Sequence, residues 1–102
     1  MIIIGEKING TIPVVKEAIA NRDAAFIADR ASRQAMAGAN YIDVCASTAP
    51  EHEIETLKWL IEVVQDATDT PLSIDSPNPR AIEAVFKYAQ KPGMINSISE
   101  EG

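Results

Sequence analysis

The sequence predicts an α/β protein built from parallel strands and crossover helices. Short apolar, β-branched runs alternate with longer helical segments along the chain. Glycine, proline or a helix-capping residue stands at nearly every boundary between them. The first two helices form a single connection, so the order is strand, helix, strand, helix, strand, helix, strand. Strands that alternate with helices in this way lie parallel in one sheet.

The first strand is expected over Ile2–Ile4, a β-branched run that ends at Gly5. A polar loop is expected over residues 6–11. Pro13 suits the first turn of a short helix, because proline lacks the N–H group that a helix leaves unpaired there. That helix is expected to run through Ala20.

Asp23 is a good N-cap for a second helix, because its carboxylate can accept a hydrogen bond from the first turn. This alanine-rich helix is expected over residues 24–37. Gly38 then stands where a left-handed residue commonly ends a helix. The second strand is expected over Asn40–Cys45, followed by a loop.

A long helix is expected from about Glu51 to Ala67. Its apolar residues recur at helical spacing and predict a stripe that faces the core: Ile54, Leu57, Leu60, Ile61 and Val64. The third strand is expected over Leu72–Asp75. Asn78 then caps a third predicted crossover helix with Pro79 in its first turn. The residues expected on its buried face are Ala81, Ile82, Val85, Phe86 and Ala89.

The fourth strand is expected over Met94–Ile98, and Met36 and Met94 are expected in the core. A (β/α)₈ barrel needs about 250 residues, whereas this chain has 102. We therefore expect residues 1–102 to be an incomplete N-terminal half of such a TIM barrel, with three βα units and a fourth strand. The alternative is an open, flavodoxin-like sheet that is complete at four or five strands.

The composition excludes several classes of function. The formal net charge of −6 argues against a nucleic-acid surface, which needs a basic face, and against an anionic membrane surface. No apolar run approaches the ~20 residues of a membrane span. The start lacks the charged and long apolar regions of a signal peptide. Cys45 is the single cysteine, so no internal disulfide can form. A cytoplasmic protein is expected.

Polar side chains cluster where the predicted strands end. The carboxyl ends of parallel strands form one rim, where α/β proteins bind ligands. The candidate site residues on this rim are Asp43, Asp75 and Asn96, with Glu6, Asn9 and Ser97 as further candidates. Together, carboxylates and an amide suit a flat heterocycle with an N–H edge. They suit a metal less well, because no histidine or cysteine joins them, so no metal site is expected.

Each candidate has a structural alternative, since Asp75 and the nearby Asn78 can simply turn and cap the chain. His52 is the single histidine, and we interpret it as a solvated residue of a first helical turn rather than a base. Cys45 is interpreted as a small buried hydrophobe, and Trp59 as packing. No P-loop, GxGxxG, CxxC or HExxH motif is present.

Four segments carry a resemblance to a known family. The opening IGEKING resembles the start of the pterin-binding methyltransferases, which act between methyltetrahydrofolate and corrinoid proteins. Their second, third and fourth strands resemble ANYIDV, LSIDS and MINS of this chain. The folate domain of cobalamin-dependent methionine synthase belongs to the same family. The resemblance covers the whole chain, with its motifs in the family's order.

This resemblance implies a dihydropteroate synthase-like (β/α)₈ barrel that dimerises and binds a pterin at the carboxyl ends of its strands. It implies that Asp75 and Asn96 hydrogen-bond the pterin ring, with Asp43 nearby. The implied reaction transfers a methyl group between N5 of methyltetrahydrofolate and the cobalt of a corrinoid (cobalamin) on a partner protein. The later strands, which supply further pterin contacts in the family, are absent, so weak pterin binding or none is expected.

Two other functions remain open. Dihydropteroate synthase shares the strand-end Asp and Asn, but it carries a glycine-rich, arginine-containing loop after the second strand. Residues 45–50 of this chain lack that pattern. The second alternative is a non-catalytic module that binds a pterin or associates through the open edge of its sheet. No catalytic residue is predicted.

Overall fold

The structure is a computed structural model that describes residues 1–89 and 94–96 of the chain. Within these residues the elements are β1 (Ile4–Asn9), α1 (Pro13–Ala20), α2 (Ala24–Met36), β2 (Tyr41–Cys45), α3 (Pro50–Ala67), β3 (Leu72–Asp75), α4 (Pro79–Phe86) and β4 (Met94–Asn96). The strands form one sheet in the order β1-β2-β3-β4, and every neighbouring pair is parallel. The predicted α/β class and parallel arrangement are confirmed.

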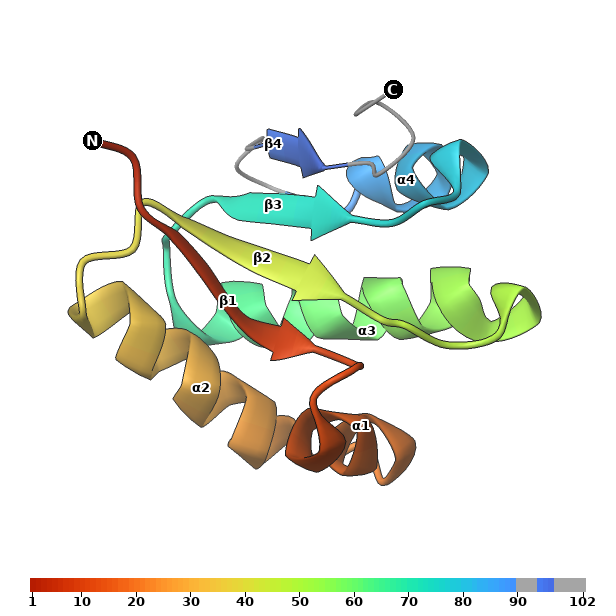
Figure 1. The fold of residues 1–102 in the computed structure, drawn as a ribbon, viewed down its shortest axis with the longest axis horizontal. Coiled ribbons are helices and arrows are strands. Elements are labelled where there is room, and N and C mark those ends of the chain that lie inside the picture. The colour runs from red at the N-terminus through yellow and green to blue at the C-terminus, as the bar shows by residue number, and fades with distance from the viewer. Residues whose placement is uncertain (90–93, 97–102) are drawn as a thin grey trace.

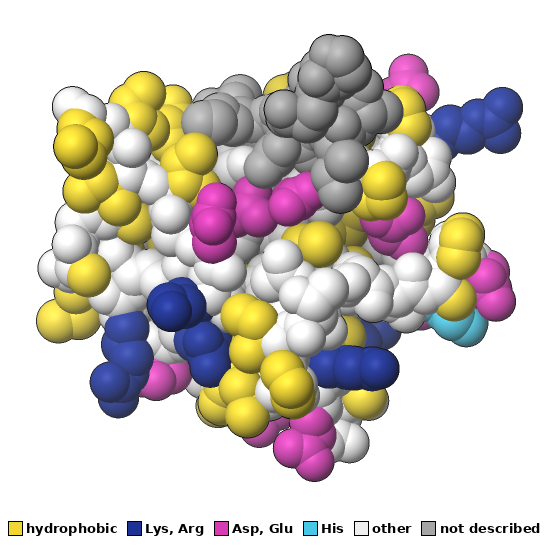
Figure 2. All heavy atoms as spheres, in the orientation of Figure 1, with side chains coloured by type: hydrophobic (Ala, Val, Ile, Leu, Met, Phe, Trp, Pro, Cys, Tyr) yellow, Lys and Arg dark blue, Asp and Glu magenta, His cyan; other side chains and the backbone are white. Residues whose placement is uncertain are grey.

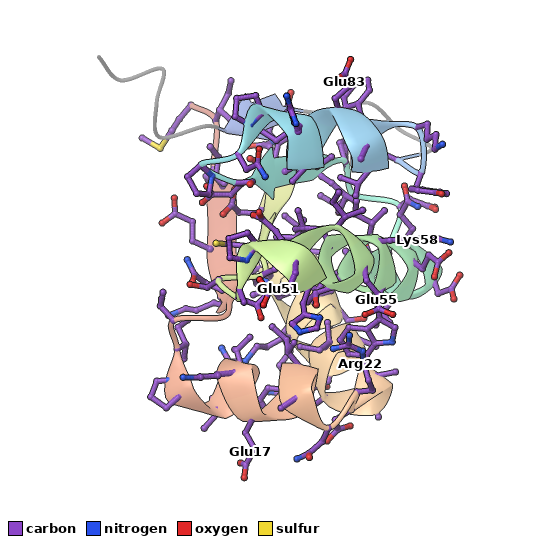
Figure 3. All side chains as sticks on the ribbon, turned by 90° about the vertical axis from the view of Figure 1, so that its right-hand side faces the viewer. Glu17, Arg22, Glu51, Glu55, Lys58 and Glu83 are labelled. Carbon is purple, nitrogen blue, oxygen red and sulfur yellow. The ribbon has the colours of Figure 1, made fainter. Side chains whose placement is uncertain are left out.

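The sheet and its helices form two layers. Helices α2, α3 and α4 pack against one face of the strands, and α1 lies beside the end of β1 (Figure 1). No helix of the described chain covers the other face. All four strands point the same way, toward the right of Figure 1, so their carboxyl ends share one rim. Figure 3 looks onto that rim.

The core lies between the sheet and the helices. Successive side chains along each strand point to opposite faces of the sheet, and the apolar ones point toward the helices. Ile42 and Val44 of β2 are fully buried, and Leu72 and Ile74 of β3 are at most 2% exposed. They meet the apolar stripe of α3, which consists of Leu57, Leu60, Ile61 and Val64, each 0% exposed. Burying one such side chain contributes about 1.5–3 kcal/mol. This layer therefore fixes which side of each strand faces the helices.

The predicted bounds of the first strand are wrong. Ile2 and Ile3 are 65% and 47% exposed, and the strand runs instead over Ile4–Asn9, through the expected loop. Pairing with β2 decides this, since Ile4 lies opposite Tyr41 and the ladder continues to the carboxyl end of both strands. Ile8, 0% exposed, anchors the strand in the core.

Three residues expected in the core are exposed instead. Ile54 is 44% exposed because Glu53, four residues before Leu57, occupies the inward position of the first turn of α3. Phe86 is 36% exposed at the last residue of α4, and Met36 is 87% exposed at the last residue of α2. The last residue of a helix can extend past the part of the helix that packs against the sheet, and its side chain then stays in solvent.

The helix boundaries follow the predicted caps. The Asp23 side chain accepts a hydrogen bond from the backbone N–H of Phe26 at 3.1 Å, and Asn78 accepts one from Arg80 at 3.1 Å. Gly38 adopts φ +101°, the left-handed conformation expected after α2. Within the described residues, no helix combines the length and the apolar character needed to cross a membrane.

Candidate functional site

The sheet brings two of the predicted site residues together on its open face. Asp43 lies opposite Ser73 in the pairing of β2 with β3. Because Ile42, Val44, Leu72 and Ile74 face the helices, their neighbours in the strands face the opposite way. Asp43, Ser73 and Asp75 therefore share the face that the helices leave open, near the carboxyl rim.

Asp43 is deeply buried and interacts with the side chains of Ser73 and Asp75. Its side chain is 3% exposed, and the Ser73 hydroxyl donates a hydrogen bond to its Oδ1 at 2.8 Å. Burial raises the pKa of Asp43 from 3.8 to about 7. The Ser73 hydrogen bond opposes this rise, whereas the charges of Asp75 and Glu6 add to it. Asp43 therefore carries a proton below about pH 7.

Acidic side chains gather in the middle of this face, over the strands (Figure 2). Glu6, Asp43 and Asp75 interact electrostatically there. Glu6 is exposed and Asp75 is half-buried. Glu6 lies within β1 rather than in the predicted loop, at the irregularity in pairing between Gly5 and Ile8. Three carboxyl groups so close together favour a ligand that donates hydrogen bonds.

The other predicted site residues have separate outcomes. Asn9 ends β1, and its Oδ1 accepts hydrogen bonds from the N–H and hydroxyl groups of Thr11 at 2.9 and 2.8 Å, so it turns the chain into α1. The backbone of Asn96 pairs with that of Asp75, which places it in the strand next to this carboxylate. Ser97 lies outside the described residues, as does the end of the predicted fourth strand.

Sequence reasoning missed the residues that support the two aspartates. Ser73 alternates with Leu72 and Ile74, and this period of two was the signal that could have placed it beside Asp43. Glu53 lies four residues before Leu57, so the spacing of the apolar stripe of α3 could have shown it facing inward.

A buried hydrogen bond fixes the loop that follows Asp75. The Ser76 hydroxyl, in a residue that is 0% exposed, donates to Oε2 of Glu53 on α3. The Ser76 oxygen also accepts a hydrogen bond from the N–H of Asn78 at 3.0 Å. This link joins the end of β3 to the start of α3, and it sets the position of Asp75 at the rim.

Ser76→Ala is expected to destabilise the fold by about 1–3 kcal/mol, because it leaves the buried Glu53 carboxylate and the Asn78 N–H without their partner. Urea unfolding measures this loss, with Ser47→Ala on the exposed loop after β2 as the control. Equal stability of the two variants would contradict the importance of this link.

Cys45 ends β2 and is half-buried. Burial, together with the charges of Asp75 and Asp43, raises the pKa of its thiol from 9.0 to about 11. Its thiolate fraction at neutral pH is accordingly small, which agrees with the prediction of an unreactive cysteine. His52 is exposed in the first turn of α3, also as predicted. Trp59 packs partly buried against the core.

Iodoacetamide is expected to alkylate Cys45 about 100-fold more slowly at pH 8 than it alkylates a free cysteine, since only the thiolate reacts. Asp75→Asn removes one of the charges that raise the thiol pKa and is expected to speed the reaction. Mass spectrometry follows both rates. A wild-type rate equal to that of free cysteine would contradict the raised pKa.

The arrangement suits recognition of a flat, polar ring. The Asp75 side chain offers two oxygens to hydrogen-bond donors, and a protonated Asp43 both donates and accepts. Within the described residues, no group of three or more His, Cys, Asp and Glu side chains is arranged to hold a metal ion. The fold is thus a parallel α/β sheet covered by helices on one face, and the carboxyl groups at its strand ends suit a small polar heterocycle.

The chain belongs to the pterin binding enzyme family, whose profile matches residues 8–102. It is 64% identical over all 102 residues to a methylcorrinoid:tetrahydrofolate methyltransferase from Eubacterium limosum. It spans only 38% of that relative's length. The resemblance predicted from the four sequence segments is therefore confirmed.

The fold is also similar to a solved structure, dihydropteroate synthase from Xanthomonas albilineans in complex with 7,8-dihydropteroate. The TM-score is 0.65 and the sequences are 27% identical. The match covers 96% of this chain and 34% of the synthase. This similarity confirms the dihydropteroate synthase-like type of fold.

Proposed function

We propose that this chain forms part of the pterin site of an enzyme that transfers a methyl group between N5 of tetrahydrofolate and the cobalt of a corrinoid. The observation that carries the proposal is the 64% identity to a methylcorrinoid:tetrahydrofolate methyltransferase over the whole chain. The pair of carboxyl groups on the open face supports it independently, since it suits the N–H edge of a pterin.

In this proposal, Asp75 accepts hydrogen bonds from the aminopyrimidinone edge of the pterin. Asp43, which Ser73 orients, offers a second polar contact beside it. Asn96 extends the row of contacts into the next strand. Glu6, Asn9 and Ser97 remain candidates at the edge of the same site. Charge-assisted hydrogen bonds of this kind are the strong ones in ligand recognition.

The chemistry explains what the residues of the chain must do. The N5 atom of a methylated tetrahydrofolate is a poor leaving group unless it gains a proton or hydrogen bond. A corrinoid supplies or accepts the methyl group at its cobalt when it is bound. The residues of this chain bind and orient the pterin, which brings N5 into line for transfer.

Several partners follow from the same proposal. The corrinoid is carried by a partner protein, and the enzyme is a cytoplasmic homodimer that needs neither a nucleic acid nor a membrane.

Residues 1–102 form the N-terminal part of the pterin-binding barrel domain, from β1 to β4. The supporting observation is that the chain spans 38% of the methyltransferase, while β1 and β4 form the two edges of the sheet.

A second candidate is a dihydropteroate synthase-like activity, which the similarity to the Xanthomonas albilineans enzyme favours. The loop after β2, residues 46–49, counts against it. This loop contains no basic side chain for the pyrophosphate group of a synthase substrate. The methyltransferase proposal therefore takes precedence.

Calorimetric titration with two ligands tests the proposal. The chain is expected to bind 5-methyltetrahydrofolate, and to bind 6-hydroxymethyl-dihydropterin pyrophosphate at least 10-fold more weakly. Preference for the pyrophosphate would contradict the methyltransferase proposal and favour the synthase. Binding of neither ligand would contradict the proposal that the chain holds a pterin.

A further inference from the structure

Strand β1 has one residue more than β2 at the level of the candidate site. The ladder pairs Gly5 with position 42 of β2, and it next pairs Ile8 with position 44. Glu6 and Lys7 therefore both lie opposite a single residue of β2, which is Asp43. Such an extra residue is a β-bulge, and a bulge re-aims the side chains of its strand. What holds this bulge therefore bears on the site.

The bulge decides which residues of β1 face the candidate site. Gly5 lies against a side chain of α2 and Ile8 is buried in the core, so both face the helices. In a regular strand, residues three positions apart face opposite ways. Because of the bulge, Glu6 faces the open side, where its charge acts on Asp43. Asn9, which follows Ile8, faces that side too, whereas a regular strand would turn Ile8 out of the core instead.

The backbone of Lys7 is bonded to α2, which lies along β1 (Figure 1). Its N–H donates a hydrogen bond to Oε1 of Gln34 at 2.9 Å. Its carbonyl accepts one from Nη1 of Arg30 at 3.4 Å. Gln34 and Arg30 are four residues apart, so their side chains lie on the same face of α2. Backbone groups that leave a ladder need other partners, and here α2 supplies them.

Gln34 and Gly5 fit together at this point. The Gln34 side chain is buried, with 9% exposure. A Cβ atom at residue 5 would collide with Oε1 of Gln34 and lie 2.9 Å from its Cδ, so glycine is what lets the amide reach the N–H of Lys7. Among residues 1–89 and 94–96, Nε2 of Gln34 has no hydrogen-bond partner. The oxygen is therefore the half of the amide that holds β1.

We propose that Gln34 is a positioning residue of the candidate site, because it holds the bulge that turns Glu6 and Asn9 onto the face of Asp43. The identity of the ligand in this inference rests on the proposed function. Gln34 itself lies on the helix side of the sheet and acts through the backbone of Lys7. Without its oxygen, the N–H of Lys7 loses its partner and the bulge is free to shift.

Gln34→Leu tests the proposal, because leucine has similar bulk but cannot accept a hydrogen bond. The amide hydrogen of Lys7 is expected to exchange about 10-fold faster in this variant than in the wild type. The pKa of Asp43 is expected to fall as Glu6 moves away from it. Hydrogen-exchange NMR and a ¹³C titration of the Asp43 carboxyl group measure the two changes, and neither needs a ligand.

Two comparisons separate positioning from a general loss of stability. Gln65→Leu is the matched control, since Gln65 on α3 also bonds to a backbone group, the carbonyl of Tyr88, at 2.9 Å. It is expected to leave both measurements unchanged. Glu6→Gln removes the charge of Glu6 directly. Adding Gln34→Leu to Glu6→Gln is therefore expected to lower the pKa of Asp43 no further.

Gly5→Ala is an independent second variant, because its Cβ displaces the same amide oxygen. It is expected to produce the same two changes as Gln34→Leu, so the proposal stays testable if one of the two variants fails to fold. Relative to Gln65→Leu, each is also expected to bind 5-methyltetrahydrofolate about 3- to 10-fold more weakly.

Three results would overturn the inference. In the first, Lys7 exchange and the Asp43 pKa in Gln34→Leu match those in Gln65→Leu. In the second, Gln34→Leu lowers the Asp43 pKa equally with and without Glu6→Gln, so that Glu6 is not what it positions. In the third, both ligand-free changes occur but the affinity for 5-methyltetrahydrofolate stays the same. Absence of binding by the wild type would count against the proposed function, while the ligand-free measurements would still test Gln34.

Discussion

Asp75→Ala is expected to weaken binding of tetrahydrofolate to the chain about 10- to 100-fold. The proposed site uses this half-buried carboxylate for paired hydrogen bonds to the pterin edge. Hydrogen bonds to a charged group contribute about 1.5–3 kcal/mol, and every 1.4 kcal/mol is a tenfold change in affinity. Isothermal titration calorimetry measures the loss directly.

Asp29→Ala is the matched control for this change. Asp29 is an exposed carboxylate on α2 whose partner is Arg33, at 2.7 Å. Its removal is expected to leave the affinity within twofold of wild type. If Asp75→Ala had no larger effect than Asp29→Ala, Asp75 would have no part in holding the pterin.

Asp43→Asn is expected to abolish the loss of stability that Asp43 causes as pH rises from about 4 to about 7. Burial raises the pKa of Asp43 to about 7 in the folded chain, against 3.8 for an exposed aspartate. Between these values the folded state keeps a proton that the unfolded state has lost. The free energy of unfolding of the wild type therefore falls as pH rises toward about 7, by about 2–4 kcal/mol from this one group.

The asparagine side chain is neutral at every pH and can still accept the hydrogen bond from Ser73. The variant is thus expected to match the wild type near pH 4 and to exceed its stability at pH 8. Urea unfolding at the two pH values measures the difference, with Asp29→Asn as the control. A constant difference between variant and wild type across this range would contradict the raised pKa of Asp43.

The sequence predicted those parts of the fold that local chemistry decides. Asp23, Gly38 and Asn78 act on the backbone within a few residues of their own position, so the helix ends beside them were predicted closely. The end of α4 was predicted wrongly, because the helix stops at Phe86 and does not reach Ala89. The bounds of β1 were wrong because strand pairing is a non-local property. The irregularity between Gly5 and Ile8 also disturbs the alternation that would have shown the strand.

The candidate site was likewise predicted only in part, because some of its features are local and others depend on strand pairing. The rule that parallel strands share a carboxyl rim placed Asp43 and Asp75 together before any contact was known. Their environment could not be predicted, because it depends on register. The Ser73 hydrogen bond, which joins residues 30 positions apart in sequence, exists only because β2 and β3 pair with Asp43 opposite Ser73.

The loop after β3 shows how a helix can support a strand-end site. Glu53 looks like an ordinary charged residue in a first helical turn, yet it is 7% exposed and accepts the Ser76 hydroxyl. A charged residue this deeply buried indicates a specific partner. Here the partner lies next to Asp75, so the start of α3 helps to set the position of the candidate site.

A crystal structure of the chain with tetrahydrofolate tests the central claim most directly. The account predicts the pterin ring at the carboxyl ends of β2 and β3, with ring N–H groups within about 3 Å of the Asp75 carboxylate. Asp43 is expected beside the ring and still bonded to Ser73. A pterin bound elsewhere, with no contact to Asp43 or Asp75, would contradict the proposed site.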